Sequence, residues 1–325
     1  MRRWSRSSLA LLSVVAVAVA AGVVACGGDK TPQATASTPF NGDSALSYAR
    51  QTVAFGPRIP GTEAARKAGD WMVARLRATA DTVIEQTWTH TTQKGEKLPL
   101  RNILARFRPN EKNRVLYLTH WDTRPRADSD PIAANRDKPF DGANDGASGV
   151  GLFLALADQL KKTPPAYGVD LLLVDGEDWG TFGPPDVDVL IGSEYFAAHL
   201  PEPGYKPLFG VLFDMIGDKE LEIKQEPNSI DAAPEVVQRV WSTAKDLGYE
   251  STFVPRAGDY PITDDHIPLI RAGLRVIDVI DLEYPDHEAV MAGQSYHHAT
   301  SDTMDKISAK SLKIVGDVAL TLVRP

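Results

Sequence analysis

From residue 40 onward, short apolar runs alternate with longer segments in which apolar residues recur every three or four positions. The apolar runs, bounded by polar, Gly or Pro residues, predict strands at Asn102 to Phe107, Val115 to Thr119, Val169 to Val174, Val211 to Phe213 and Val276 to Ile280. Helical spacing occurs at 62–79, where Thr62 is the expected cap, and at 147–162, 232–247, 264–272 and 305–323. Nearly all-apolar strands that alternate with helices are typical of a sheet covered on both faces. We therefore expect one α/β domain, residues 40–325, with a mixed, mostly parallel central sheet and helices on both faces.

The N-terminal residues have the pattern of a targeting segment. Arg2, Arg3 and Arg6 precede an apolar run from Leu9 to Ala25 that ends at Cys26. Val23-Val24-Ala25-Cys26 resembles the lipobox of bacterial lipoproteins, in which the Cys is lipidated and becomes the new N-terminus. We thus expect a signal peptide at 1–25, then lipidated Cys26 and a flexible tether at 26–39. An ordinary secretory signal and an uncleaved anchor are the alternatives.

Composition restricts the possible partners and sites. The chain of 325 residues has 43 Asp+Glu against 35 Lys+Arg, a net charge of −8, and a single Cys. This acidic balance argues against nucleic-acid binding, which needs a broad basic face. One Cys excludes an intrachain disulfide and a Cys-based zinc site, so a metal must be held by His, Asp and Glu. A monomer is expected, although the sequence leaves the oligomeric state open.

Potential metal ligands follow several of the predicted strands. They are His120 and Asp122, Glu177 and Asp178, Asp214, and His297 and His298, with Asn144 and Asp145 in a Gly-rich turn before the 147–162 helix. Each alone has a simpler interpretation as a cap, a turn or a surface residue. Ligands of open α/β sheets bind at the carboxyl ends of the strands, and clustered carboxylates repel one another unless a cation neutralises them. Together these residues therefore predict a metal site.

Other catalytic signatures are missing from the sequence. It has no His-Glu-x-x-His helix, no phosphate-binding Gly-x-x-x-x-Gly-Lys-Ser/Thr loop and no Gly-x-Gly-x-x-Gly turn. Ser148 and Ser193 do not lie in the Gly-x-Ser-x-Gly pattern of a nucleophilic serine. Two loops, Thr123 to Phe140 and Thr181 to Val189, flank the motifs and are either the rim of a pocket or ordinary solvated loops.

The order and spacing of these motifs resemble the M28 zinc aminopeptidase superfamily over about residues 45–325. Within it, several segments are more similar to glutaminyl-peptide cyclotransferases than to aminopeptidases: Thr119 to Pro125, Asp141 to Gly149, Asp175 to Gly180, Phe213 to Gly217 and Asp264 to Pro268. The last segment, Asp-Asp-His-Ile-Pro, is the most discriminating. The chain differs from animal cyclases in having His297-His298-Ala299 where they have Trp-His-Thr, and in having Asp178 where many relatives have Glu.

The resemblance implies a zinc aminopeptidase-like fold and assigns a role to each site residue. Asp145, Asp178 and His298 match the ligands of a single zinc ion, with His297 as the alternative to His298. Glu177 matches the residue that transfers protons, and Asp214 and Asp264 match the carboxylates that complete the site. His120 matches a ligand of a second metal, which dinuclear aminopeptidases bind.

Three functions are compatible with this resemblance and these residues. The favoured one is a zinc-dependent glutaminyl-peptide cyclotransferase that acts on peptide or protein N-termini bearing Gln and releases ammonia. The second is an M28-type zinc aminopeptidase, and the third a non-catalytic lipoprotein that binds peptides. The expected location is the bacterial cell envelope, where a lipid anchor would hold the protein on the periplasmic or the outer surface. The sequence does not indicate which membrane leaflet carries the anchor.

Overall fold

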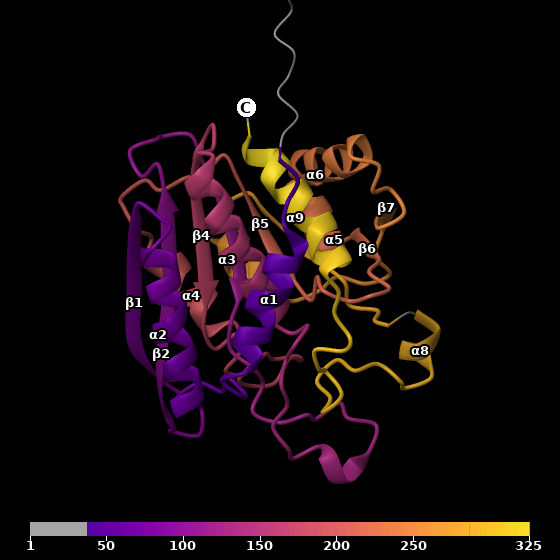
Figure 1. The fold of residues 1–325 in the computed structure, drawn as a ribbon. Helices are drawn as coiled ribbons and strands as arrows, with labels where there is room; N and C mark the ends of the chain where they lie inside the picture. The colour runs from indigo at the N-terminus through magenta and orange to yellow at the C-terminus, as the bar shows by residue number, and fades with distance from the viewer. Residues whose placement is uncertain (1–37, 286, 325) are drawn as a thin grey trace, which may run out of the picture. The chain divides into compact units, whose positions relative to one another are not determined.

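A mixed six-stranded sheet runs through the centre of the described part of the chain (Figure 1). The computed structural model describes residues 38–285 and 287–324. In spatial order the strands are β1 (Thr82–Thr91), β2 (Lys97–Phe107), β4 (Gly168–Val174), β3 (Arg114–His120), β5 (Phe209–Asp214) and β8 (Val276–Ile280). The pairs β1–β2 and β2–β4 are antiparallel, whereas β4–β3, β3–β5 and β5–β8 are parallel. The mixed, mostly parallel sheet predicted from the sequence is therefore confirmed.

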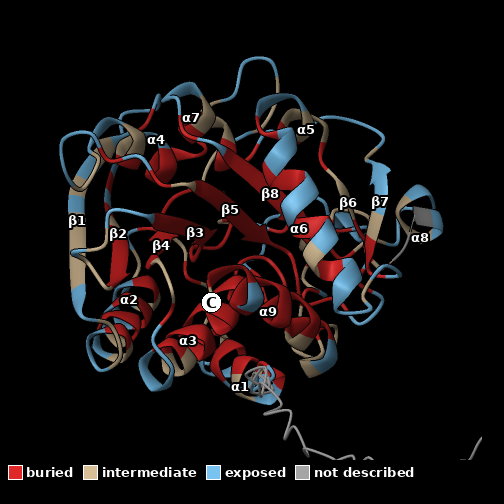
Figure 2. Cartoon of the chain, turned by 90° about the horizontal axis from the view of Figure 1, so that it is seen from above, coloured by how far each residue is buried: buried red, intermediate tan, exposed pale blue. Residues whose placement is uncertain are grey.

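Helices cover both faces of this sheet (Figure 2). One face carries α1 (Gly42–Val53), α2 (Glu63–Arg77), α3 (Ala147–Lys162) and α9 (Ala309–Val323). The other face carries α4 (Ile191–Ala198) and α7 (His266–Arg271), while α5 (Pro227–Ala232) and α6 (Pro234–Asp246) pack near β8. Smaller elements are the parallel pair β6 (Ile223–Gln225) and β7 (Phe253–Ala257), α8 (His287–Met291) and a 3-10 turn at Ala133–Asn135.

The two helical layers explain why most residues of the inner strands are apolar. In β3, Val115 and Tyr117 join the core under α1, α2, α3 and α9, whereas Leu116 and Leu118 join the core under α4 and α7. Every residue of β3, β4, β5 and β8 is buried. Since neither face meets water, a strand in the middle of this sheet has no polar side to alternate with.

A buried cluster of charged side chains lies at the end of the sheet opposite to the carboxyl ends of the parallel strands. Asp170 of β4 accepts hydrogen bonds from Arg106 Nε at 3.0 Å, from Arg114 Nε at 2.8 Å and from the Tyr205 hydroxyl at 2.9 Å. The Asp170 side chain is fully buried, and Arg106 and Arg114 are at most 5% exposed. The carboxylate is therefore the buried counter-charge of two guanidinium groups.

The elements missed by the sequence analysis are short or partly exposed. Strand β1 forms one edge of the sheet, and its residues are exposed or half-buried, so it lacks the continuous apolar signal of the inner strands. By contrast, α3 and β8 have the predicted bounds, and α2 begins directly after its Thr62 cap, whose side chain accepts from the Ala65 N–H.

The predicted signal peptide, lipidation site and most of the tether lie outside the described residues. From Pro39 onward the described residues form one compact unit. Among them, no helix combines the length and the apolar character that a membrane span requires.

Candidate active site

The carboxyl edge of the sheet collects acidic and imidazole side chains from separate parts of the chain. His120 ends β3, Asp214 ends β5, and Glu177 and Asp178 follow β4. Asp145 lies in the Gly-rich turn, two residues before α3. All five residues are at most 6% exposed. The topology of parallel strands, whose carboxyl ends meet at one edge, is the reason that these residues become neighbours.

A pocket of ≈ 470 Å³ opens onto this edge. Its polar lining includes Asp145, Glu177, Asp178, Asp214, Asp264, His297 and His298, and its apolar lining includes Phe182, Met215, Ile262, Ile280 and Leu282. Arg124, Asp128 and Ser129 contribute from the 123–140 loop, and Thr181 and Phe182 from the 181–189 loop. Both loops thus border the pocket, as one of the two sequence interpretations predicts. The pocket combines an acidic floor with an apolar wall suited to an aliphatic part of a ligand.

Three of the predicted zinc ligands lie together at the floor of the pocket. His298 Nε2 is 3.4 Å from Asp145 Oδ2 and 3.2 Å from Asp178 Oδ2. The alternative ligand, His297, has its Nε2 at 3.9 Å from Asp145 Oδ2 and a more exposed side chain. His298 is therefore the better placed of the two histidines, although ligand atoms of Asp145, His297 and His298 also all lie within 4.8 Å of one another.

A second possible set of ligands shares Asp145 with the first. His120 Nε2 lies 3.0 Å from Asp145 Oδ1 and 3.1 Å from Asp214 Oδ1, and the ligand atoms of these three residues lie within 4.8 Å of one another. The two carboxylate oxygens of Asp145 thus face different histidines. A second metal, which His120 predicts, would share Asp145 with the first.

The donor chemistry fits a zinc ion. The buried atom Asp178 Oδ2 makes no hydrogen bond of regular geometry among the described residues, and its ion-pair contact is His298 Nε2 at 3.2 Å; a buried acceptor without a hydrogen bond is costly unless something else binds it. Imidazole nitrogen and carboxylate oxygen are both zinc ligands. Asp145, Asp178 and His298 would hold the ion, and a bound cation would satisfy the orphaned oxygen.

The pKa values of the histidines also indicate that the clustered carboxylates attract positive charge. Burial lowers the pKa of His298, but the carboxylates of Asp178 and Asp145 outweigh this effect and raise it to about 10. Burial also opposes protonation of His120, whose pKa is nevertheless well above its usual range because of Asp214, Asp122 and Asp145. By contrast, burial and the neighbouring His298 lower the pKa of His297 to about 3. Protons on His298 and His120 therefore neutralise the acidic floor, and metal binding would displace them.

The carboxylates predicted to act on substrate have raised pKa values. Burial is the largest cause for Glu177, whose pKa is well above its usual range even though the neighbouring His120 opposes the increase. Burial, followed by the charge of Asp214, raises the pKa of Asp264 in the same way. Burial also raises the pKa of Asp214. Such pKa values are typical of groups that exchange protons with a ligand.

Backbone hydrogen bonds hold the two functional loops in place. Asp122 accepts from the Glu177 N–H at 3.2 Å and from the Asp178 N–H at 3.3 Å. Asp302 accepts from the Asn144 N–H at 2.9 Å and from the Asp145 N–H at 3.2 Å. These two aspartates thus hold the backbone of the segments that carry Glu177, Asp178 and Asp145.

Two arginines that were not predicted from the sequence support the site. Arg58 is fully buried and donates to the carbonyl of Gly142 at 2.8 Å, so it holds the Gly-rich turn before Asp145. Arg124 donates to Asp178 Oδ1 at 2.7 Å. Arg58 lies far from the motifs in sequence, and no local pattern distinguishes it. Arg124 lies inside the Thr119 to Pro125 segment, and membership of this segment is the sequence feature that could have indicated its role.

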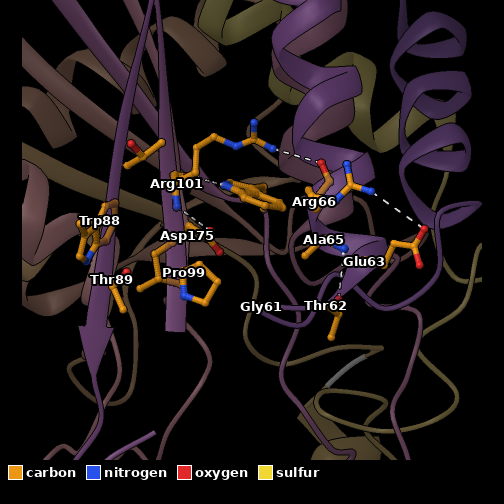
Figure 3. Close-up of a pocket in the computed structure, with 13 residues that line it drawn as sticks. Gly61, Thr62, Glu63, Ala65, Arg66, Trp88, Thr89, Pro99, Arg101 and Asp175 are labelled. Carbon is orange, nitrogen blue, oxygen red and sulfur yellow. Dashed lines mark hydrogen bonds and ion pairs between the residues drawn. The ribbon is translucent and has the colours of Figure 1, made fainter. Parts of the chain in front are cut away.

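A separate, larger pocket of ≈ 690 Å³ lies between the start of α2 and the β1–β2 ribbon (Figure 3). Trp121, beside the motif residues His120 and Asp122, lines this second pocket. Its side chain is 2% exposed and its indole N–H donates to the Arg101 carbonyl at 3.1 Å. Trp121 is therefore a core residue behind the site.

The comparisons with known proteins place this site in a family. The model of "Peptidase family M28" matches residues 102–323, which is more than half of the chain. The chain belongs to peptidase family M28. All residues of the candidate site lie within the matched range.

Solved structures of two named activities share this fold. A glutaminyl cyclase from Porphyromonas gingivalis is 37% identical, with a TM-score of 0.82 over 88% of this chain and 98% of that one. A leucine aminopeptidase precursor from Bacteroides thetaiotaomicron is 34% identical, with a TM-score of 0.82 over 88% of this chain and 97% of that one. These neighbours confirm the fold class, and they support both of the enzymatic functions considered.

Curated relatives include a cyclotransferase and an aminopeptidase. Bovine glutaminyl-peptide cyclotransferase is 28% identical over 77% of this chain and 75% of its own length. The chain spans less than half of the length of two other curated relatives that it matches, 46% and 40% of them.

Proposed function

We propose that the chain is a zinc-dependent glutaminyl-peptide cyclotransferase, which converts an N-terminal Gln to pyroglutamate and releases ammonia. The observation that carries this proposal is the position of Asp264. It belongs to the Asp264 to Pro268 segment, which resembles the cyclases, and it lines the same pocket as Glu177 and Asp214. A hydrolase that uses metal-activated water gives no evident task to this additional buried carboxylate.

Each residue of the pocket then has a role in the cyclisation. The α-amine of the substrate attacks the carbon of its own side-chain amide; the new C–N bond closes a five-membered lactam, and the bond to the amide nitrogen breaks. A zinc ion bound by Asp145, Asp178 and His298 would supply Lewis acidity toward the γ-carbonyl. Glu177 accepts a proton from the attacking amine and returns it to the departing nitrogen. Asp214 and Asp264 orient the leaving amide.

One metal is enough in this scheme because the nucleophile is already attached to the electrophile. An intramolecular attack of this kind gains from proximity, which in favourable geometries is worth up to about 7–11 kcal/mol. We therefore propose a single zinc ion, with His120 hydrogen-bonded to Asp214 instead of bound to a second metal.

The second candidate is a zinc aminopeptidase. The observation that favours it is the ligand set of His120, Asp145 and Asp214, which lies beside the first and shares Asp145 with it. Two neighbouring cations would activate a water for hydrolysis.

The test is to incubate the zinc-loaded full chain with two peptides that differ only in an N-terminal Gln or Leu, and to follow their masses. Loss of ammonia from the Gln peptide alone, at a rate at least tenfold above the spontaneous reaction, is the expected result. Release of a free amino acid from either peptide would show a peptidase instead. If neither peptide changes although zinc is bound, both enzymatic functions are excluded, and a non-catalytic peptide-binding lipoprotein remains.

We also propose that Cys26 is the lipid attachment site and that the protein is exported to the cell envelope. Expressed in a bacterial host with radiolabelled palmitate, the full chain should be labelled and the Cys26→Ser variant should not. Cys26 is the only Cys of the chain. A matched control therefore combines Cys26→Ser with Ser37→Cys, which keeps one thiol in the tether but moves it away from the lipobox. Labelling of this control, or of Cys26→Ser itself, would contradict lipidation at the lipobox.

A further inference from the structure

Arg124 connects a predicted metal ligand to the loop that borders the pocket. Its Nη1 donates to Asp178 Oδ1 at 2.7 Å, while Nε and Nη2 each donate to the Asp128 carboxylate at 2.8 Å. Arg124 is 5% exposed, and Asp178 is 1% exposed. A buried guanidinium with two carboxylate partners in this fork geometry is held firmly, because each contact is a charge-assisted hydrogen bond.

The same loop also fixes the segment that carries His298. The Ser129 N–H donates to the His298 carbonyl at 3.1 Å, and Asp128 Oδ1 lies 3.8 Å from His298 Nδ1. One residue further on, Asp130 Oδ2 accepts from the Thr300 N–H at 2.9 Å and from its hydroxyl at 2.6 Å. The 123–140 loop therefore joins two predicted ligands that lie far apart in the sequence.

The two oxygens of Asp178 are consequently in different states. Oδ1 accepts the hydrogen bond from Arg124, whereas Oδ2 has no hydrogen-bond partner among the described residues and lies 3.2 Å from His298 Nε2. A carboxylate can bind a metal through one oxygen or through both. For Asp178 to use both, Oδ1 would have to share or give up its contact with a buried positive charge.

We propose that Arg124 is a positioning residue that restricts Asp178 to binding the metal through Oδ2 alone. With one atom each from Asp145 and His298, three protein ligand atoms would hold the zinc ion, and a fourth position would remain for the substrate. The proposal rests on the metal site and not on the cyclisation, so it stands or falls independently of which peptide is turned over.

The experiment replaces zinc by one equivalent of Co²⁺ in the full chain and records the visible absorption, which is more intense for four-coordinate than for five- or six-coordinate Co²⁺. The wild type should show the four-coordinate spectrum. Arg124→Gln should lose a large part of this intensity, because both oxygens of Asp178 become available. Its zinc affinity, measured by competition with a chelating dye, should fall about 10–100-fold, as for other residues that support metal ligands.

Arg126→Gln is the matched control. It removes one positive charge from the same loop, but Arg126 is exposed and none of the contacts to Asp178 described above involves it. This variant should keep the wild-type spectrum and affinity. If it changes the spectrum as much as Arg124→Gln does, loop charge and not the Arg124 contact is responsible, and the proposal fails.

Two further results would overturn the inference. One is an Arg124→Gln variant that folds, as judged by circular dichroism and thermal melting, and retains the wild-type Co²⁺ spectrum. The second result comes from the wild-type chain alone, so it can be obtained even if Arg124→Gln does not fold. X-ray absorption of the wild-type chain with one equivalent of zinc should give four nearest neighbours, and a higher number that includes both Asp178 oxygens would contradict the proposed role.

Discussion

Glu177→Gln is expected to lower the turnover of Gln-initiated peptides by about 10²–10⁴-fold, the usual contribution of a general acid–base group. The amide has the size of the carboxylate but cannot accept a proton from the attacking amine. Zinc content should remain unchanged, because the contacts among Asp145, Asp178 and His298 do not involve the Glu177 side chain. The measurements are the initial rate of ammonia release and the metal content of the purified variant.

Glu194→Gln is a suitable control for this experiment. Glu194 lies in the first turn of α4 and is exposed, so the same chemical change there should leave the rate within about twofold of the wild type. A Glu177→Gln enzyme with more than half of the wild-type rate would remove Glu177 from the mechanism. Loss of both zinc and activity would instead show that Glu177 supports the metal site.

Asp170→Ala is expected to destabilise the domain by about 3–5 kcal/mol, the range found when one partner of a buried ion pair is removed. The substitution leaves Arg106 and Arg114 buried without the carboxylate that both contact, at 3.0 Å and 2.8 Å. It also removes the acceptor of the Tyr205 hydroxyl. Urea denaturation should show a lower midpoint with an unchanged slope.

Glu235→Ala provides the comparison for Asp170→Ala. Glu235 pairs with Arg275 at 3.0 Å, but both side chains are about half exposed, and surface ion pairs of this kind contribute only about 0–1 kcal/mol. The unfolding free energy should therefore hardly change. If Asp170→Ala were equally mild, the buried cluster would not be what stabilises this end of the sheet.

The local elements were predictable because each leaves a signal within a few consecutive residues. The residues of β3, β4, β5 and β8 are buried on both faces, so these strands appear as mostly apolar runs, although Asp170 interrupts β4 and Asp278 interrupts β8. The edge strand β1 escaped prediction because its residues are partly exposed and polar residues interrupt the run. The same logic identified the acidic residues at strand ends, since parallel strands deliver their carboxyl ends to one edge.

Pairwise contacts between distant residues were not predictable in this way. Both His297 and His298 are reasonable ligands by composition, and only the path of the chain places His298 Nε2 within 3.4 Å of both Asp145 and Asp178. Arg58 reaches the Gly142 carbonyl across 84 positions of the sequence, and Arg124 reaches Asp178 across 54. No local period encodes such contacts, because they join residues that only the folded chain brings together.

The amino-acid sequence alone was enough to predict the α/β class, the edge of the sheet at which chemistry is possible, and the types of ligand available there. These properties follow from burial, from the direction of the strands and from the presence of a single Cys, all of which a linear pattern records. Only the tertiary structure shows which oxygen of Asp178 lacks a hydrogen bond, which histidine is the better placed, and which arginine contacts Asp178. Those choices depend on distances of a few ångströms between separate loops, and only the packed chain sets such distances.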